Sequence, residues 1–337
     1  MNSDVLVSIV VPVYNTSLYL EQCLQTLVSQ TLKEIEIICV NDASTDNSLE
    51  ILNEWAERDS RITVINFEKN RRQGAARNTA IRRARGKYIG LVDSDDYINE
   101  DMYRSLVANS DDFTADIVVA NLNAKHGSSD ELECNFKERP YTQDDIVKSV
   151  LVNGCRMFTN IFKRSLFVEY ELWYPEGVIY EDNANMAPLF MAAQKVNVLY
   201  NECPYYYYRV DNQSTVRSLD NIHCWDRLIT ADMFLEHTRR LNKYEKFKEE
   251  IDYSYFSLAI INSFRFAMFS FSRYQYKKVK EIIAKYKTEI GFDVIRKNKY
   301  YIEDNNLLRK IITELISRFP IAGYVFWAYS HLKRKLK

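Results

Sequence analysis

The chain has 337 residues, of which 47% are hydrophobic and 27% are charged. This balance is typical of a soluble globular protein and excludes an intrinsically disordered one. The formal net charge of −1 argues against nucleic acid as the main partner, because nucleic-acid binding usually requires a strong surplus of basic residues. The length is sufficient for two structural units.

Strands and helices are expected to alternate along the N-terminal third of the chain. Leu6–Val13 is a continuous apolar and β-branched run, which is typical of a strand buried on both faces. Further strands are expected at 35–40, 62–67 and 88–92, and helices at 18–30, 48–58 and 74–85. This alternation predicts an α/β fold with a doubly wound, mostly parallel sheet and helices on both faces.

The alternation fades beyond the fourth of these strands. Asp116–Asn121 is expected to be one more strand, and Gly127–Pro140 is polar and is expected to be a surface loop. From Leu219 onward the pattern is helical. We therefore expect one domain at 1–218 and a helical C-terminal region at 219–337.

Cysteines and apolar segments bear on the cellular compartment. None of the six cysteines forms a C-x-x-C pair, so the sequence indicates neither a zinc site nor a thioredoxin-like motif. The first four residues lack the positive charge of a signal peptide and lead directly into a strand, so we expect a cytoplasmic protein. No segment has the roughly 20 uninterrupted apolar residues of a membrane span. The nearest, Leu258–Ser272, is interrupted by Arg265.

Polar and acidic residues follow three of the predicted strands. They are Tyr14-Asn15, Asn41-Asp42 and Asp93-Ser94-Asp95-Asp96. In doubly wound sheets, ligands bind just beyond the carboxyl ends of the strands, so we expect the functional site at this edge. Hard cations such as Mg²⁺ or Mn²⁺ prefer carboxylate oxygen and bridge well to diphosphates, so Asp93 and Asp95 are candidate metal ligands. A solvated acidic turn is the alternative for this segment taken alone.

The segment Asn41–Asp46 also has two interpretations. Asp42 could accept a hydrogen bond from an N–H group of a nucleotide base. The last three residues of the segment are good helix N-cap residues, so it could also be a turn that begins the helix at 48–58.

Four segments in this order resemble the motifs of family-2 glycosyltransferases with the GT-A fold, of the type that builds bacterial surface polysaccharides. They are Pro12-Val13-Tyr14-Asn15, Asn41–Asp46, Gly74-Ala75-Ala76-Arg77-Asn78 and Asp93–Asp96. Four motifs at matching spacing are far more specific than any one of them. The resemblance is close over residues 1–100 and looser to residue 217. It implies a catalytic domain whose nucleotide-binding half is 1–100 and whose acceptor half is 101–218.

The resemblance also implies roles for individual residues. The nucleotide-sugar would be bound by Pro12, Tyr14, Asp42, Arg77, Asp93 and Arg209. Asp42 would contact the base, commonly uracil, and Arg77 would support the acidic loop beside the nucleotide. Asp93 and Asp95 would hold a divalent metal, Mn²⁺ or Mg²⁺, with Asp95 as the preferred direct ligand. The family often has two acids and a glycine where this chain has Asn41-Asp42-Ala43, so Asp42 is the acid that is retained.

A later segment, Tyr180-Glu181-Asp182-Asn183, is similar to the one that supplies the catalytic base in this family. Inverting transfer needs a carboxylate that takes the proton from the attacking hydroxyl. The resemblance makes Asp182 this base and places Glu181 and Trp173 at the acceptor. The alternative is capping of the helix that follows, where acidic residues also interact favourably with the helix dipole.

Tyr205–Tyr208, Arg209, Ser214 and Thr215 resemble the flexible loop that closes over the diphosphate in this family. Arg209 could pair with phosphate oxygens through its forked guanidinium group. A strand with aromatic packing is an equal alternative.

The C-terminal region carries no motif that indicates a function. Its end combines apolar residues between Ile311 and Trp327 with the basic segment Lys333–Lys337. Such an amphipathic segment suits peripheral contact with an anionic membrane, here the inner face of the cell membrane. The alternative is a helix packed against the catalytic domain, with a solvated tail.

The sequence thus predicts an inverting enzyme that moves a hexosyl or N-acetylhexosaminyl group from a nucleoside-diphosphate sugar, expected to be a UDP-sugar, to a hydroxyl of a glycan or lipid-linked acceptor. Without a membrane span or a Q-x-x-R-W motif, it is expected to add one sugar per encounter. One alternative is a noncatalytic sugar-nucleotide- or glycan-binding protein on the same scaffold, which would lack one of the acids. Another is a nucleotidyltransferase, but Tyr14–Tyr19 lacks the glycine-rich loop of that class.

Overall fold

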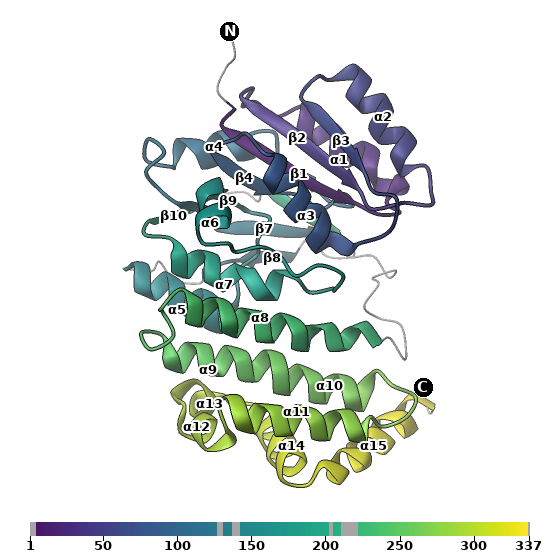
Figure 1. Ribbon diagram of the computed structural model, residues 1–337, viewed down its shortest axis with the longest axis vertical. Coiled ribbons are helices and arrows are strands. Elements are labelled where there is room, and N and C mark those ends of the chain that lie inside the picture. The colour runs from purple at the N-terminus through teal and green to yellow at the C-terminus, as the bar shows by residue number, and fades with distance from the viewer. Residues whose placement is uncertain (1–4, 127–130, 137–141, 202–204, 210–221, 336–337) are drawn as a thin grey trace. The chain divides into compact units, whose positions relative to one another are not determined.

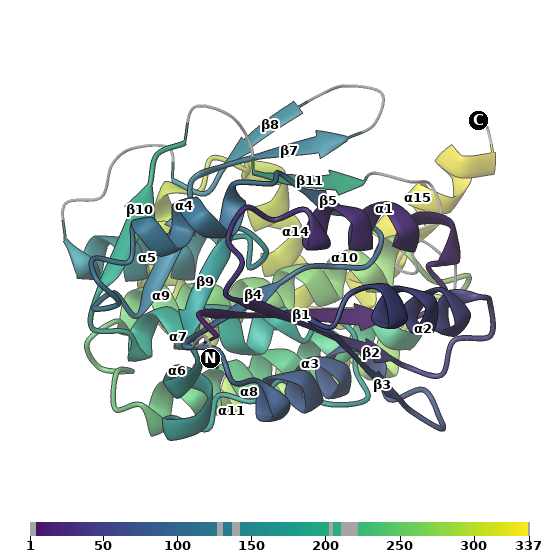
Figure 2. The ribbon, with the colours of Figure 1, turned by 90° about the horizontal axis from the view of Figure 1, so that it is seen from above.

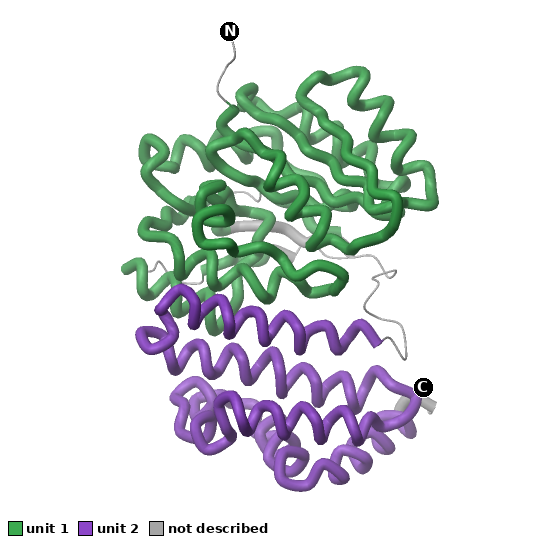
Figure 3. The backbone as a smooth tube through the Cα atoms, viewed as in Figure 1, with its two compact units in different colours: residues 1–212 green, residues 213–337 purple. Residues whose placement is uncertain are grey.

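The computed structural model describes residues 5–126, 131–136, 142–201, 205–209 and 222–335 (Figure 1). The chain divides into two compact units, residues 1–212 and residues 213–337 (Figure 3). The first unit contains two β-sheets with helices, and the described part of the second unit is helical.

The main sheet of the first unit has seven strands in the order β10-β6-β9-β4-β1-β2-β3. The strands are β1 (Val7–Val13), β2 (Ile35–Asn41), β3 (Ile62–Asn66), β4 (Tyr88–Leu91), β6 (Ile117–Ala120), β9 (Asn160–Lys163) and β10 (Val196–Leu199). All neighbours are parallel except β9, which is antiparallel to both β4 and β6. Every residue of β1 and β2 is buried, as their continuous apolar runs predict.

Helices cover both faces of this sheet. They are α1 (Ser17–Val28), α2 (Ser48–Arg58), α3 (Arg72–Arg83), α4 (Met102–Ala108), α5 (Gln143–Asn153), α6 (Arg164–Glu169) and α7 (Asp182–Ala192). Figure 2 shows α3 on one side of the sheet and α1 and α4 on the other. Helix α1 buries Leu20, Cys23, Leu24 and Leu27, which are spaced as one helical face. The predicted mostly parallel α/β architecture is confirmed.

A second sheet has the strand order β5-β11-β7-β8. Its strands are β5 (Tyr97–Ile98), β7 (Leu122–His126), β8 (Glu131–Cys134) and β11 (Tyr206–Arg209). The surface loop predicted at Gly127–Pro140 is therefore wrong for residues 131–134, which pair with β7, and Phe136 beyond them is buried. Glu131 to Cys134 does alternate polar and apolar residues, but four residues are too short a run to identify a strand. The rest of that segment lies outside the described residues.

Strand β11 decides between the two interpretations of the tyrosine-rich segment. Its aromatic rings stack on neighbours, with Tyr207 4.8 Å from Tyr97 and Tyr206 5.2 Å from Phe158 between ring centroids. Residues 206–209 are thus a strand with aromatic packing. Ser214 and Thr215, which were expected in a loop over the diphosphate, lie outside the described residues.

The second unit is helical from residue 222 onward. It contains η1 (Ile222–Trp225), α8 (Asp226–Arg240), α9 (Lys248–Phe256), η2 (Ser257–Ile261), α10 (Asn262–Phe269), α11 (Tyr276–Glu289), α12 (Phe292–Lys297), α13 (Lys299–Glu303), α14 (Leu307–Arg318), η3 (Pro320–Ala322) and α15 (Gly323–Lys335). Buried aromatic residues such as Phe256 and Tyr286, whose ring centroids are 5.7 Å apart, form its core. Within the described ranges, no helix combines the length and the apolar character that crossing a membrane requires.

Candidate active site

The carboxyl ends of β1, β2 and β4 meet at one edge of the main sheet. Strand β1 lies between β2 and β4 and is parallel to both, so the loops that follow these strands are neighbours. Hydrogen bonds join two of these loops: the backbone N–H of Asn15 donates to Ser44 Oγ at 3.0 Å, and the N–H of Thr45 donates to Asn15 Oδ1 at 2.8 Å. The structure thus brings together the polar segments that the sequence placed at strand ends.

Asp42 lies just beyond β2 and is only 3% exposed. Its Oδ1 accepts the backbone N–H of Arg71 at 2.6 Å, and its Oδ2 accepts the N–H of Arg72 at 2.8 Å. Asp42 therefore caps the start of α3. Burial raises its pKa, although the two backbone donors act in the opposite direction. Each carboxylate oxygen keeps one lone pair, so the cap leaves capacity for the base contact that the sequence predicts.

The capping of α2 is supplied by a different acid of the same segment. Asp46 Oδ1 accepts the backbone N–H of Ser48 at 3.0 Å, and its Oδ2 accepts the N–H of Ser17 at 2.9 Å. Between the two acids, Ala43 has φ +58°, in the left-handed region that favours glycine. The segment Asn41–Asp46 is thus a turn with caps at both ends.

Three carboxylates gather at the end of β4. Oxygen atoms of Asp93, Asp95 and Asp96 lie within 4.8 Å of one another, near enough to share one cation. The burial of the three differs, because Asp95 is exposed, Asp93 is half-buried and Asp96 is buried. This all-oxygen set fits the donor preference of Mg²⁺ or Mn²⁺.

Uncompensated negative charge accumulates in this cluster. Burial raises the pKa of Asp93 to about 6, with Asp95 and Asp182 adding to the rise and Arg77 opposing it. Burial and the charges of Asp93 and Asp95 raise the pKa of Asp96 to about 8. Such a site favours a positively charged ligand, because a cation relieves the repulsion between the carboxylates.

Arg77 connects the acidic loop to the segment that carries the predicted base. Its guanidinium group is 1% exposed; Nη2 donates to Asp93 Oδ1 at 2.8 Å, and Nη1 donates to Glu181. The ring of Tyr174 packs beside it at 5.8 Å. Arg77 is too deeply buried to bind nucleotide directly, so it acts as a positioning residue for Asp93, in line with the expected support of the acidic loop.

The structure separates the roles of two adjacent acids. Glu181 is 3% exposed and paired with Arg77, so its side chain is not available for the acceptor contact that the sequence suggested. Asp182 is the first residue of α7 and remains partly exposed. It directly follows Glu181, whose partner Arg77 also pairs with Asp93, and its charge contributes to the raised pKa of Asp93. Glu181, at the N-cap position, makes no side-chain capping hydrogen bond.

The chain segment before α7 is fixed to α3. Asn78 Nδ2 donates to the carbonyl oxygen of Tyr174 at 2.9 Å, and the N–H of Tyr174 donates back to Asn78 Oδ1 at 2.9 Å. A Cβ atom added to Gly74 would lie 2.1 Å from the carbonyl oxygen of Pro175, so only glycine permits this approach. The Gly74–Asn78 motif therefore docks residues 174–175 onto the helix.

The remaining predicted site residues are more dispersed. Pro12 is buried inside β1, whereas Tyr14 is 43% exposed at its end. Trp173 packs against the Arg82 guanidinium group at 4.5 Å. Arg209 ends β11; its guanidinium group donates to Gln22 and lies 5.0 Å from the centroid of the Tyr19 ring.

Comparison with known proteins decides the family. Residues 8–170 match the family model described as glycosyl transferase family 2. The chain is 31% identical over 256 residues to the putative glycosyltransferase EpsH of Bacillus subtilis, and the match covers 73% of each chain. It is 33% identical over 220 residues to the glycosyltransferase GlyG of Streptococcus pneumoniae, covering 60% of this chain and 71% of the relative. The chain belongs to glycosyltransferase family 2.

Solved structures agree with this family. Residues 1–349 of TarS from S. aureus superpose with a TM-score of 0.67 at 20% identity, covering 98% of this chain and 92% of that one. The same fragment in complex with UDP-GlcNAc has a TM-score of 0.58, covering 84% and 90%. The predicted GT-A fold is thus confirmed. By its family, the chain is a glycosyltransferase.

The sequence did not indicate that Asp96 and Tyr206, each part of a quoted segment, are hydrogen-bonded to each other. Asp96 Oδ2 accepts the hydroxyl of Tyr206 at 2.7 Å, and its Oδ1 accepts the backbone N–H of Arg209 at 2.8 Å. The acidic loop is thereby attached to β11. The motif Asp93–Asp96 did contain this acid, but its partners lie more than a hundred residues away in the chain, where no local signal could indicate them.

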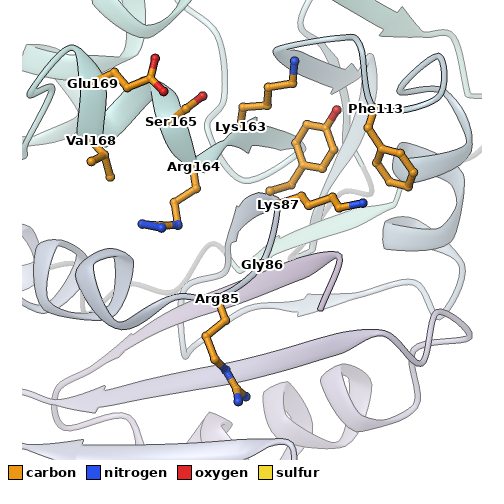
Figure 4. Close-up of a pocket in the computed structure, with 10 residues that line it drawn as sticks. Arg85, Gly86, Lys87, Phe113, Lys163, Arg164, Ser165, Val168 and Glu169 are labelled. Atoms are coloured by element: carbon orange, nitrogen blue, oxygen red, sulfur yellow. The ribbon is translucent and has the colours of Figure 1, made fainter. Parts of the chain in front are cut away.

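A cavity of the transferase lies away from these residues. It has a volume of about 460 Å³ and is found at the opposite end of β4 from Asp93 (Figure 4). Its lining includes Lys87, Lys163 and Arg164, and among the described residues that line it none belongs to the predicted site. This basic pocket is therefore separate from the acidic edge.

Proposed function

We propose that this family-2 enzyme is an inverting transferase that uses a UDP-sugar and a divalent cation, with Asp182 as its base. The observation that carries the proposal is that Arg77 pairs with both Asp93 and Glu181, so that the metal-binding cluster and the residue before Asp182 share one side chain. An inverting enzyme needs both groups around one anomeric carbon: a base for the acceptor and a centre that holds the leaving diphosphate.

The proton-transfer role falls to Asp182. The attacking hydroxyl must lose its proton as it bonds to the anomeric carbon, and a partly exposed carboxylate can accept that proton. The neighbouring Glu181 is buried and is paired with Arg77. Asp182 is consequently the acid of this pair that an acceptor can reach.

The donor side is assigned to the acidic loop and to Asp42. Asp95, with Asp93 beside it, would hold Mn²⁺ or Mg²⁺, which supplies positive charge for the diphosphate as it leaves. Asp42 would accept the base N–H with its remaining lone pairs, and Tyr14, exposed at the end of β1, would lie against the nucleotide. Arg209 would meet the phosphates through its guanidinium group.

The substrate assignment rests on the relatives. The TarS fragment of similar fold binds UDP-GlcNAc, so we propose UDP as the carrier and a hexosyl or N-acetylhexosaminyl group as the sugar transferred. We assign the acceptor to the hydroxyl of a glycan or a lipid-linked glycan, with one sugar added per encounter in the cytoplasm. Trp173, next to the segment that leads to Asp182, would contact this acceptor.

Titration calorimetry of UDP with and without Mn²⁺ tests the donor site, on the native protein and on Asp95→Ala. We expect UDP binding that requires Mn²⁺ and that is lost in Asp95→Ala. Turnover of UDP-sugars by Asp182→Asn, with UDP binding retained, then tests the base. Absence of nucleoside-diphosphate binding with metal present would refute the donor site and favour a noncatalytic glycan-binding protein.

A further inference from the structure

Helix α14 exposes its apolar face and buries a more polar one. Leu307, Leu308, Ile311 and Leu315 follow helical spacing on one side, and their exposed fractions are 67%, 65%, 46% and 40%. The opposite side, which packs against the rest of the unit, buries Thr313, Ile316 and Ser317. A helix on the surface of a water-soluble unit normally has the reverse orientation.

Helix α15 repeats this arrangement. One side is attached to the unit: Trp327 Nε1 donates to the carbonyl oxygen of Phe271 at 2.9 Å, and Ser330 Oγ donates to that of Met268 at 2.9 Å. The other side exposes Tyr324, Val325, Tyr329 and Leu332, at 53%, 67%, 67% and 62%. These hydrogen bonds hold α15 with its apolar side outward.

The two helices that carry these apolar faces are adjacent. Helix α14 contacts α15, and the short η3 turn contacts both. Phe319, just before this turn, is 61% exposed, and Ile321, within it, is 64% exposed. We call the exposed apolar residues of α14, η3 and α15 together the α14–α15 surface. Apolar exposure of this extent on neighbouring elements indicates a binding surface, because water-soluble proteins rarely leave so many large apolar side chains exposed together.

The charge of the residues around this surface indicates which kind of partner it binds. Between Leu307 and Lys335 the sequence has six Lys and Arg residues and a single acid, Glu314, in a chain whose net charge is −1. Glu314 is paired with Arg296 at 2.9 Å and with Arg318 at 3.6 Å, so the one acid of this segment is already neutralised, and the Arg318 side chain is still 63% exposed. A second copy of the chain would bring two basic surfaces together, which like-charge repulsion disfavours. An anionic lipid surface offers apolar and electrostatic complementarity at once.

We propose that the α14–α15 surface binds the headgroup region of an anionic bilayer. Leucine, isoleucine and valine side chains enter the boundary between headgroups and acyl chains, to a depth of roughly 5–10 Å. Tyr324 and Tyr329 occupy the interface, where amphipathic rings are favoured. The basic residues meet the lipid phosphates. This inference is independent of the proposed donor and base, since it rests only on the second unit.

Vesicle co-sedimentation of the full chain tests the surface. We expect at least about tenfold more binding to phosphatidylglycerol vesicles than to phosphatidylcholine vesicles, decreasing with added salt. The combined variant Leu308→Ser, Ile311→Ser and Val325→Ser should lower binding by about tenfold or more. Ile229→Ser is the matched control, since Ile229 is 51% exposed on α8 outside the surface. Circular dichroism of each variant verifies folding.

Two results would overturn the proposal. One is native protein that remains in solution with both kinds of vesicle. The other is a combined variant that is folded and still binds as well as the native chain. Light scattering tests self-association as the other explanation of the surface. A native chain that is dimeric and does not bind vesicles, with a combined variant that is monomeric, would also overturn the proposal and assign the surface to self-association. Arg318→Gln, which leaves the apolar face intact, should lower binding about fivefold if lipid charge is recognised.

Discussion

The hydroxyl of Tyr206 donates a 2.7 Å hydrogen bond to Asp96 Oδ2, across 110 residues of sequence. The hydroxyl oxygen of Tyr206 itself accepts the backbone N–H of Asp93 at 3.2 Å. One side chain of β11 therefore fixes both the first and the last acid of the loop after β4. The acidic loop depends on a strand from the second sheet for its shape.

Removing this hydroxyl should loosen the acidic loop. In Tyr206→Phe, the buried Asp96 loses one of its two hydrogen bonds, so we expect a loss of about 1–3 kcal/mol in the free energy of unfolding and weaker Mn²⁺-dependent UDP binding. Urea denaturation and calorimetry measure the two effects. Tyr208→Phe on the same strand is the control, because its ring is 38% exposed and should change neither quantity. Equal behaviour of the two variants would contradict the role of Tyr206.

Loss of the Arg77 charge should destabilise the fold strongly. In Arg77→Ala, Asp93 and Glu181 face each other without the cation between them, and breaking a buried ion pair from one side destabilises by about 3–5 kcal/mol. Thermal denaturation should show this as a large decrease in melting temperature. Arg82→Ala, on the same helix with a side chain that is 52% exposed, should have little effect on melting. A small effect of Arg77→Ala would mean that Asp93 and Glu181 find other partners.

The neighbouring acids Glu181 and Asp182 should give opposite phenotypes. Glu181→Gln weakens the pairing with buried Arg77, so we expect reduced stability. Asp182→Asn leaves that pair intact, so we expect near-native stability with turnover reduced by at least about 10²-fold, the range for loss of a general base. Melting curves and initial rates on the same preparations separate the two effects. Unchanged turnover in Asp182→Asn would exclude it as the base.

The stability of the metal-free protein should fall as pH rises. The pKa of Asp93 is raised from 3.8 to about 6, and that of Asp96 from 3.8 to about 8. Between 3.8 and its raised pKa, each group binds more protons in the folded state than in the unfolded state, so stability falls as pH rises through that range. Ionisation of the clustered carboxylates is therefore progressively unfavourable up to about pH 8. Melting temperatures in EDTA should record this decline.

Two further measurements test whether these carboxylates cause the decline in stability with pH. Mn²⁺ should restore stability most at the high end of the range, where it no longer competes with protons. Asp96→Asn should flatten the profile, because it removes the acid whose pKa is raised most. A profile that is flat in the native protein would mean that the carboxylates are not protonated on folding.

The left-handed conformation of Ala43 offers a stabilising substitution. A non-glycine residue at φ +58° is strained, and glycine should relieve roughly 1 kcal/mol. Ala43→Gly is thus expected to raise the urea midpoint. Ala56→Gly within α2 makes the same chemical change at an ordinary helical position and should lower it by a similar amount. Changes of the same sign in both variants would refute the argument from backbone conformation.

The sequence was sufficient for features that local patterns encode. The apolar run of Leu6–Val13 and the spacing of Leu20 to Leu27 predicted buried strands and an amphipathic helix, and the acids after β4 were found from their place at a strand end. The sequence could not indicate which acids would be buried. Glu181 and Asp182 are adjacent and chemically alike, and only the position of Arg77 in the fold distinguishes them.

Long-range partners explain the other differences. Asp42 caps α3 through the backbone of Arg71 and Arg72, a contact that depends on how the loop after β3 returns to the sheet. Strand β8 was not predicted from the sequence, because a four-residue strand gains its stability from pairing with β7 and not from its own composition. In each case the deciding contact joins segments whose separation in sequence gives no periodic signal.

Helix α3 has contacts with every part of the proposed reaction centre: its first turn with Asp42, its middle with Asp93, and the Gly74–Asn78 side with the segment before Asp182. Donor and acceptor recognition consequently share one mechanical support. Substitutions inside α3 should shift the Michaelis constants of both substrates together, whatever their chemistry. Efforts to change the sugar preference of this transferase alone are therefore better directed at residues outside α3.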